Sequence, residues 1–217
     1  MTTEFLIHKL ASDLPPVRPL GRPVTRLAQW VLITAVLTCF SVFLSGSRPD
    51  IAAALFQPAF LLRTLLMLGI GAAAAFAALS FSIPGSTEKW PVVASIVGVT
   101  LFLGLLAFWL VSDNSFVPGP GKLCLRNVLG VGIVTGAILC VMLRRAAPIK
   151  AGLVGLFASL GAASLANVGT QFICRHESPA HLLVWHIIPV AVLCGAGILA
   201  GRLLFRWNDQ KRPADAP

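Results

Sequence analysis

The chain has 217 residues, of which 57% are hydrophobic and only 12% are charged. A soluble domain carries about twice that charged fraction, so the composition excludes an ordinary soluble protein and predicts a polytopic membrane protein. At roughly 20 residues per transmembrane helix, six spans with short loops would use the whole chain.

The net charge of +9 has two interpretations. In a soluble protein it would suggest a nucleic-acid partner. In a membrane protein, Lys and Arg gather on the cytoplasmic side and set the topology. We therefore predict membrane lipid as the surroundings and no direct contact with nucleic acid.

Residues 1–26 are predicted to be a cytoplasmic segment that binds a partner. Apolar residues recur at near-helical spacing, which predicts a short amphipathic helix over residues 3–14. These residues are Phe5, Leu6, Leu10 and Leu14. Prolines from Pro15 to Pro23 prevent the helix from continuing, so an extended tether should follow. Such a helix could enter a groove on a partner protein or lie on the bilayer surface.

Residues 27–207 are predicted to form a domain of six transmembrane helices, and residues 208–217 a cytoplasmic tail. The apolar blocks cover approximately residues 27–44, 59–81, 91–111, 128–143, 151–168 and 182–205. The fold class is therefore an all-α integral membrane protein. Twelve of the 17 Lys and Arg residues fall on the side that carries the termini. The positive-inside rule then places both termini in the cytoplasm.

The five cysteines fall into two groups. Cys39, Cys140 and Cys194 lie inside apolar blocks, where cysteine usually acts as a small apolar residue. Cys124 and Cys174 lie in predicted outward loops. They could form a structural disulfide, act as a reactive or metal-binding pair, or be unrelated free thiols.

A metal site is one of these alternatives. Thiolates with imidazoles suit zinc, cadmium or copper, and zinc favours four such ligands. The nearby candidates are Cys124, Cys174, His176 and His181. His186 falls one turn into the last apolar block and is predicted to be a hydrogen-bonded core histidine.

Three classes of function compete for such a membrane protein. Enzyme signatures such as a nucleophile elbow, a P-loop or HExxH are missing from the sequence, so we predict that the protein is not an enzyme. A membrane redox enzyme would also need a CxxC pair or a quinone site. The alternative of a small transporter or channel for a metal or another solute is disfavoured, because the spans carry no charge near their middle. An interaction protein remains.

Several stretches resemble the NrsF family of six-span bacterial membrane anti-sigma factors. They are residues 6–22 (LIHKLASDLPPVRPLGR), 46–50 (GSRPD), 83–85 (IPG), 142–149 (MLRRAAPI), 181–186 (HLLVWH) and 201–207 (GRLLFRW). Their order along six apolar blocks carries the resemblance, which covers nearly the whole chain.

This resemblance implies an anti-sigma factor of the bacterial inner membrane. Such a protein would hold an extracytoplasmic-function sigma factor through its cytoplasmic parts. Cys124 and Cys174 occupy the loops of the family's cysteine pair, which is implicated in responses to metal or oxidative stress. We expect the sigma factor to dock on the N-terminal helix. The docking residues would be Leu6, Lys9, Leu10, Asp13 and Leu14.

Overall fold

The structure is a computed structural model that describes residues 2–12, 20–83, 85, 88–113, 115–144, 146, 148 and 150–205. Within these residues all regular elements are helical, which confirms the all-α part of the predicted fold class. The elements are α1 (Thr3–Ser12), α2 (Pro23–Ser45), α3 (Ile51–Ala54), α4 (Pro58–Phe81), α5 (Trp90–Asp113), α6 (Lys122–Arg144), α7 (Ala151–Ile173), α8 (Pro179–Leu182), the π-helical segment η1 (Leu183–Ile187) and α9 (Ile188–Leu204).

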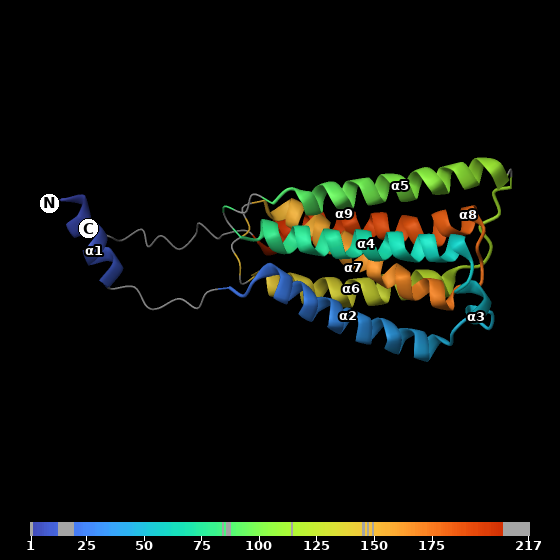
Figure 1. Cartoon of the computed structure of the whole chain (residues 1–217). Helices are drawn as coiled ribbons and strands as arrows, with labels where there is room; N and C mark the ends of the chain where they lie inside the picture. Colours follow the sequence, from blue (N-terminus) through green and yellow to red (C-terminus); the bar gives the residue numbers. More distant parts are fainter. Residues whose placement is uncertain are drawn as a thin grey trace.

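Six helices in the described residues are long and apolar enough to cross a membrane, as the composition predicted. They are α2, α4, α5, α6, α7 and the continuous helix Pro179–Leu204, which joins α8, η1 and α9. The spans run side by side, and α2 begins at the same end of the bundle at which α9 ends (Figure 1). Which end faces the cytoplasm remains a prediction from the Lys and Arg distribution.

Two helices extend further toward one end of the bundle than the apolar blocks suggested. The sequence predicted a span from residue 128, but α6 already begins at Lys122. It also predicted an end near residue 168, whereas α7 continues to Ile173. Cys124 therefore lies in the first turn of a helix and not in a loop, and Cys174 is the residue that caps α7. Both thiols are buried, with 5% of each residue exposed.

Small residues allow α7 and α9 to pack with their backbones in contact. A Cβ atom on Gly155 would lie 2.0 Å from the carbonyl oxygen of Gly197, and one on Gly201 would lie 2.4 Å from that of Ala151. Gly155 and Ser159 of α7 thus meet Gly197 and Gly201 of α9. Close backbone approach of this kind is how membrane helices associate without a hydrophobic driving force.

Helix α2 is attached to the bundle through polar contacts. Trp30 is fully buried, and its indole Nε1 donates to the carbonyl oxygen of Thr135 at 2.9 Å. Near the start of α2, the guanidinium of Arg26 donates to the carbonyl oxygen of Met142. Both acceptors belong to α6, so these bonds fasten the first half of α2 to that helix.

The N-terminal helix α1 ends at Ser12, before the predicted end at residue 14. Phe5, Leu6 and Ile7 are all exposed, which leaves an apolar surface without a partner among the described residues. Asp13, Leu14 and the side chain of Leu10 lie outside the part of the chain that the structure describes. Their roles therefore stay predictions.

Candidate functional site

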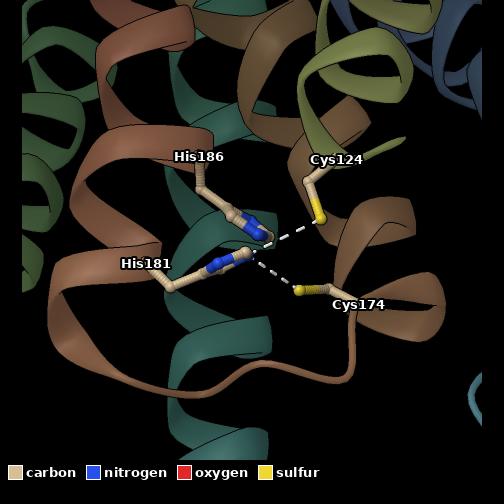
Figure 2. Close-up of side chains that lie close together, drawn as sticks. All are labelled: Cys124, Cys174, His181 and His186. Carbon is tan, nitrogen blue, oxygen red and sulfur yellow. Dashed lines mark hydrogen bonds between the residues drawn. The ribbon is translucent and has the colours of Figure 1, made fainter. Parts of the chain in front are cut away.

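Four buried side chains converge at the end of the bundle opposite the start of α2. They are Cys124, Cys174, His181 and His186, and their candidate ligand atoms all lie within 4.8 Å of one another. Figure 2 shows the two imidazoles on one helix and the two thiols on two others, all directed at a common point. The five cysteines of the chain are free thiols in this structure.

The position of Cys124 depends on the turn that precedes α6. Gly119 has a φ of 59°, a left-handed conformation that favours glycine. Gly121 is required for packing, because a Cβ atom there would lie 2.1 Å from the Trp185 ring. The indole Nε1 of Trp185 donates to the carbonyl oxygen of Gly119 at 3.0 Å. The turn is thus fixed against η1, which carries His186.

Cys174 is held by the end of its own helix and by the loop that follows. Its backbone N–H donates to the carbonyl oxygen of Thr170 at 2.8 Å, and its thiol donates to the carbonyl oxygen of His176 at 3.4 Å. In the same loop, the carboxylate of Glu177 accepts from Arg48 at 2.7 Å and lies 3.4 Å from the guanidinium of Arg63. Two buried cations therefore anchor the loop that carries Cys174.

Charge and hydrogen bonding shift the pKa values of Cys174, which belongs to the site, and of Arg48, which lies beside it. The pKa of the Cys174 thiol is lowered, chiefly by its hydrogen bond with Cys124, against the opposing effect of burial. The pKa of Arg48 is raised, chiefly by its hydrogen bond to Asp50. The lowered pKa makes the Cys174 thiol easier to deprotonate, and Arg48 stays a cation.

Each histidine of the cluster uses one ring nitrogen for an anchoring hydrogen bond. Nδ1 of His181 lies 2.7 Å from the carbonyl oxygen of Pro118, and Nδ1 of His186 lies 2.6 Å from Oδ1 of Asn167. Nε2 of His181 lies 3.2 Å from the sulfur of Cys174 and 3.7 Å from that of Cys124. The Nε2 side of His181 therefore faces both sulfurs.

A layer of buried polar side chains lies one helical turn away from the thiols. Asn127 follows Cys124 on α6, and its amide donates to the hydroxyl of Thr170 at 2.6 Å. The same amide accepts a hydrogen bond from Ser41 of α2. Asn127 thus connects the turn that carries Cys124, the turn that precedes Cys174, and α2.

The structure brings together three of the four predicted metal ligands. His176 is exposed, and although its ring stacks on that of His181 with centroids 4.9 Å apart, it is not part of the group of four. His186, predicted to be a hydrogen-bonded core histidine, is buried and hydrogen-bonded as expected, but it also joins the group. His186 lies five residues after His181, and residues five apart point in different directions from a regular α-helix. The spacing therefore did not predict that the two rings meet.

A cavity of about 460 Å³ gives access to the thiols. Cys124 and Cys174 form part of its wall, and the cationic residues Lys122 and Arg175 and the ring of Trp185 line it as well. The cavity therefore brings open space up to the two cysteine residues at that end of the bundle.

Comparison with known proteins agrees with the resemblance noted above. The family model described as "Negative regulator of sigma F" matches residues 10–207. The chain belongs to the NrsF family. It is also 25% identical over 215 residues to the probable anti-sigma-F factor NrsF of Azospira oryzae, an alignment that covers 95% of this chain and 100% of the relative. No solved structure matches the chain.

Membership in the NrsF family assigns a regulatory class. The family is one of negative regulators, and an anti-sigma factor implies a sigma factor as its partner. A regulatory protein of this kind is generally not an enzyme, in agreement with the prediction from the missing motifs. The six apolar helices identify a membrane protein.

Proposed function

We propose that this NrsF-family protein retains an extracytoplasmic-function sigma factor at the bacterial inner membrane and releases it when Cys124 and Cys174 respond to metal or oxidative stress. The N-terminal segment would bind the sigma factor in the cytoplasm. The thiols would face the periplasm. The single observation that carries the sensing part is the meeting of two thiols from α6 and α7 in one buried site.

The exposed apolar residues of α1 support the binding part of the proposal. Leu6 is 43% exposed and is flanked by Phe5 and Ile7, which are both more than half exposed. An amphipathic helix buries such a face against a hydrophobic groove of a partner. Lys9, Leu10, Asp13 and Leu14 complete the predicted docking surface.

A change at the thiols must alter the N-terminal segment through the structure that connects them. Helix α2 is the span joined directly to that segment in the chain. Helix α2 follows that segment in the chain and extends to the end of the bundle at which the thiols lie (Figure 1). There Ser41 donates to Asn127, one turn from Cys124. A change in the separation of the two thiols would move Asn127 or Thr170 and so change the position of α2 in the bundle.

Deletion of residues 2–14 tests the binding part. Membrane-inserted protein without these residues should fail to retain the sigma factor, and transcription of the target genes should rise without stress. Cys124→Ser and Cys174→Ser should abolish induction, whereas Cys39→Ser should not. Retention of the sigma factor by the inserted deletion variant would contradict the docking site. Normal induction in both cysteine variants would contradict the sensor.

Reporter fusions test the orientation on which this proposal depends. Fusions after Asp50, Lys122 and Arg175 should report the periplasm, and a fusion after Lys150 should report the cytoplasm. A periplasmic signal at Lys150 would reverse the topology and would place the thiols on the wrong side.

A further inference from the structure

The helix that carries both histidines contains a wide turn. In a regular α-helix, residues five apart point about 140° away from each other. Leu183–Ile187 is instead π-helical, and the N–H of Ile188 donates to the carbonyl oxygen of Leu183, five residues earlier. Pro189 follows directly and has no N–H to continue the regular pattern. The wide turn brings His181 and His186 to one side of the helix, with ring centroids 5.6 Å apart.

In a neutral imidazole, the hydrogen bond at one ring nitrogen decides which nitrogen carries the proton. A carbonyl oxygen only accepts, so the Nδ1 of His181 donates to Pro118 and its Nε2 keeps a free lone pair. The amide nitrogen of Asn167 donates to the sulfur of Met67, which leaves the amide oxygen to accept from Nδ1 of His186. Both imidazoles therefore present an unprotonated Nε2. An outer partner on the other ring nitrogen is the usual arrangement for metal-binding histidines.

The Nε2 atom of His186 is a buried lone pair without a hydrogen-bond partner in the described residues. His186 is 1% exposed, so water does not solvate this nitrogen from the surface. A buried polar atom left unpaired is destabilising. The same nitrogen belongs to the group of four atoms within 4.8 Å of one another, so a cation at the centre of that group would satisfy it.

We infer that Cys124, Cys174, His181 and His186 form a closed four-coordinate site for a resident divalent metal ion of the zinc class. Zinc–sulfur bonds of about 2.3 Å and zinc–nitrogen bonds of about 2.0–2.1 Å require ligand atoms roughly 3.3–3.8 Å apart in a tetrahedron. The ligand atoms lie within 4.8 Å of one another, so the widest pair would move closer by up to roughly 1.0–1.5 Å when the ion binds. Two thiolates and a divalent ion also cancel in charge, which suits a buried site among apolar helices.

Two soft sulfurs and two imidazoles without an open position are typical of a structural zinc site. The ion would join the first turn of α6, the end of α7 and the wide turn of the last span. Only the regulatory consequence rests on the proposed function: displacement of the ion by a more thiophilic metal would change this connection.

Metal analysis of the full-length protein tests the site directly. Protein purified in detergent without chelator should contain one zinc ion per chain, measured by elemental mass spectrometry. Cys124→Ser, Cys174→Ser, His181→Ala and His186→Ala should each lose most of it. His176→Ala is the matched control, because His176 stacks on His181 from outside the group, and it should retain full zinc.

Two further variants separate metal binding from a role in packing. His186→Cys should retain zinc through a third thiolate, which a purely structural role of the imidazole does not predict. Asn167→Leu should weaken zinc binding about 10–100-fold while all four ligands remain, as removal of an outer partner usually does. Each variant is first checked for a single monodisperse species.

Each experimental outcome supports or overturns one part of the inference: the four ligands, the metal or its effect on signalling. Monodisperse His186→Ala that keeps a full equivalent of zinc would overturn the four-ligand site, as would loss of zinc in His176→Ala. Wild-type protein that takes up no zinc under reducing conditions would overturn the metal altogether, and an intact Cys124–Cys174 disulfide by mass spectrometry would assign the thiols to redox chemistry. Stoichiometric zinc without any effect on sigma-factor retention would uphold the site and contradict only the sensory function.

Discussion

Helices α7 and α2 are spans of equal length, 23 residues each, but they are built in opposite ways. α7 is the most buried of the six spans and the least apolar, whereas α2 is the least buried and faces mostly outward. Lipid is as apolar as leucine, so large apolar side chains gain little by leaving it. Small and polar residues gain contacts and hydrogen bonds instead, and they draw α7 into the centre.

The difference in burial also makes α7 a fixed helix and α2 a helix that can shift. α7 contacts α9 along its backbone, while a cavity of about 550 Å³ lies between α2 and its neighbours α4 and α7. Polar contacts at Trp30, Ser41 and Arg48 hold α2 and the loop after it. Breaking one of these contacts should therefore change the position of α2 with less damage to the bundle than a change in α7.

The largest expected effect is on the α7–α9 contact. Gly155→Ala would place a Cβ atom 2.0 Å from a backbone oxygen, which cannot move like a flexible side chain. We expect a loss of about 1–3 kcal/mol or more in the free energy of unfolding, measured by thermal unfolding in detergent. Gly195→Ala on α9 is the control, because nothing lies within 4 Å of its new Cβ atom. Equal stability of the two variants would contradict the close packing.

Asn127→Ala should have the next largest effect. It removes the acceptor of Ser41 and the donor to Thr170, and leaving buried polar groups unpaired costs about 1–3 kcal/mol. Induction by stress should fall more than this loss of stability explains, because α2 loses its contact near Cys124. Reporter transcription and thermal unfolding measure the two effects. The exposed Ser112→Ala is the control, and unchanged induction in stable Asn127→Ala protein would remove this residue from the pathway.

Glu177→Gln should cost less, on the order of 1 kcal/mol, because the carboxylate is one-third exposed and water screens its ion pairs. The change weakens the contacts of the Cys174 loop with Arg48 and Arg63. We expect faster alkylation of Cys174 by a membrane-impermeant reagent. An unchanged alkylation rate in a stable variant would show that the ion pairs do not hold this loop.

The smallest effect concerns Asp50 and pH. The hydrogen bond from Arg48 lowers the pKa of Asp50 to about 2 from an ordinary value of 3.8. The stabilising contribution is therefore complete above about pH 4 and is lost as the pH falls toward 2. Asp50→Asn should leave the pH dependence of unfolding between pH 5 and 8 unchanged. A difference between wild type and variant in that range would contradict the assigned shift.

The sequence alone determined the membrane class, the six spans and the family. Each of these depends on local composition: long apolar blocks have few alternatives in a bilayer, because the backbone must satisfy its own hydrogen bonds. The small-residue faces of α7 and α9 could be predicted for the same reason, since a spacing of four residues lines one face of a helix. Cys124, Cys174 and His181 were found because they fall in the short stretches between the apolar blocks, on the side opposite the termini.

Only the tertiary structure decided the composition of the site. His186 joins the cluster because a π-helical turn before Pro189 redirects its ring, and helical periodicity contains no sign of such a turn. His176 is closer to Cys174 in sequence, but the loop held by Glu177 leaves it outside the group of four ligands. The burial of Cys124 depends on Trp185 packing over Gly121, a contact between residues distant in the chain. Local sequence sets which side chains are available, and long-range packing sets which of them meet.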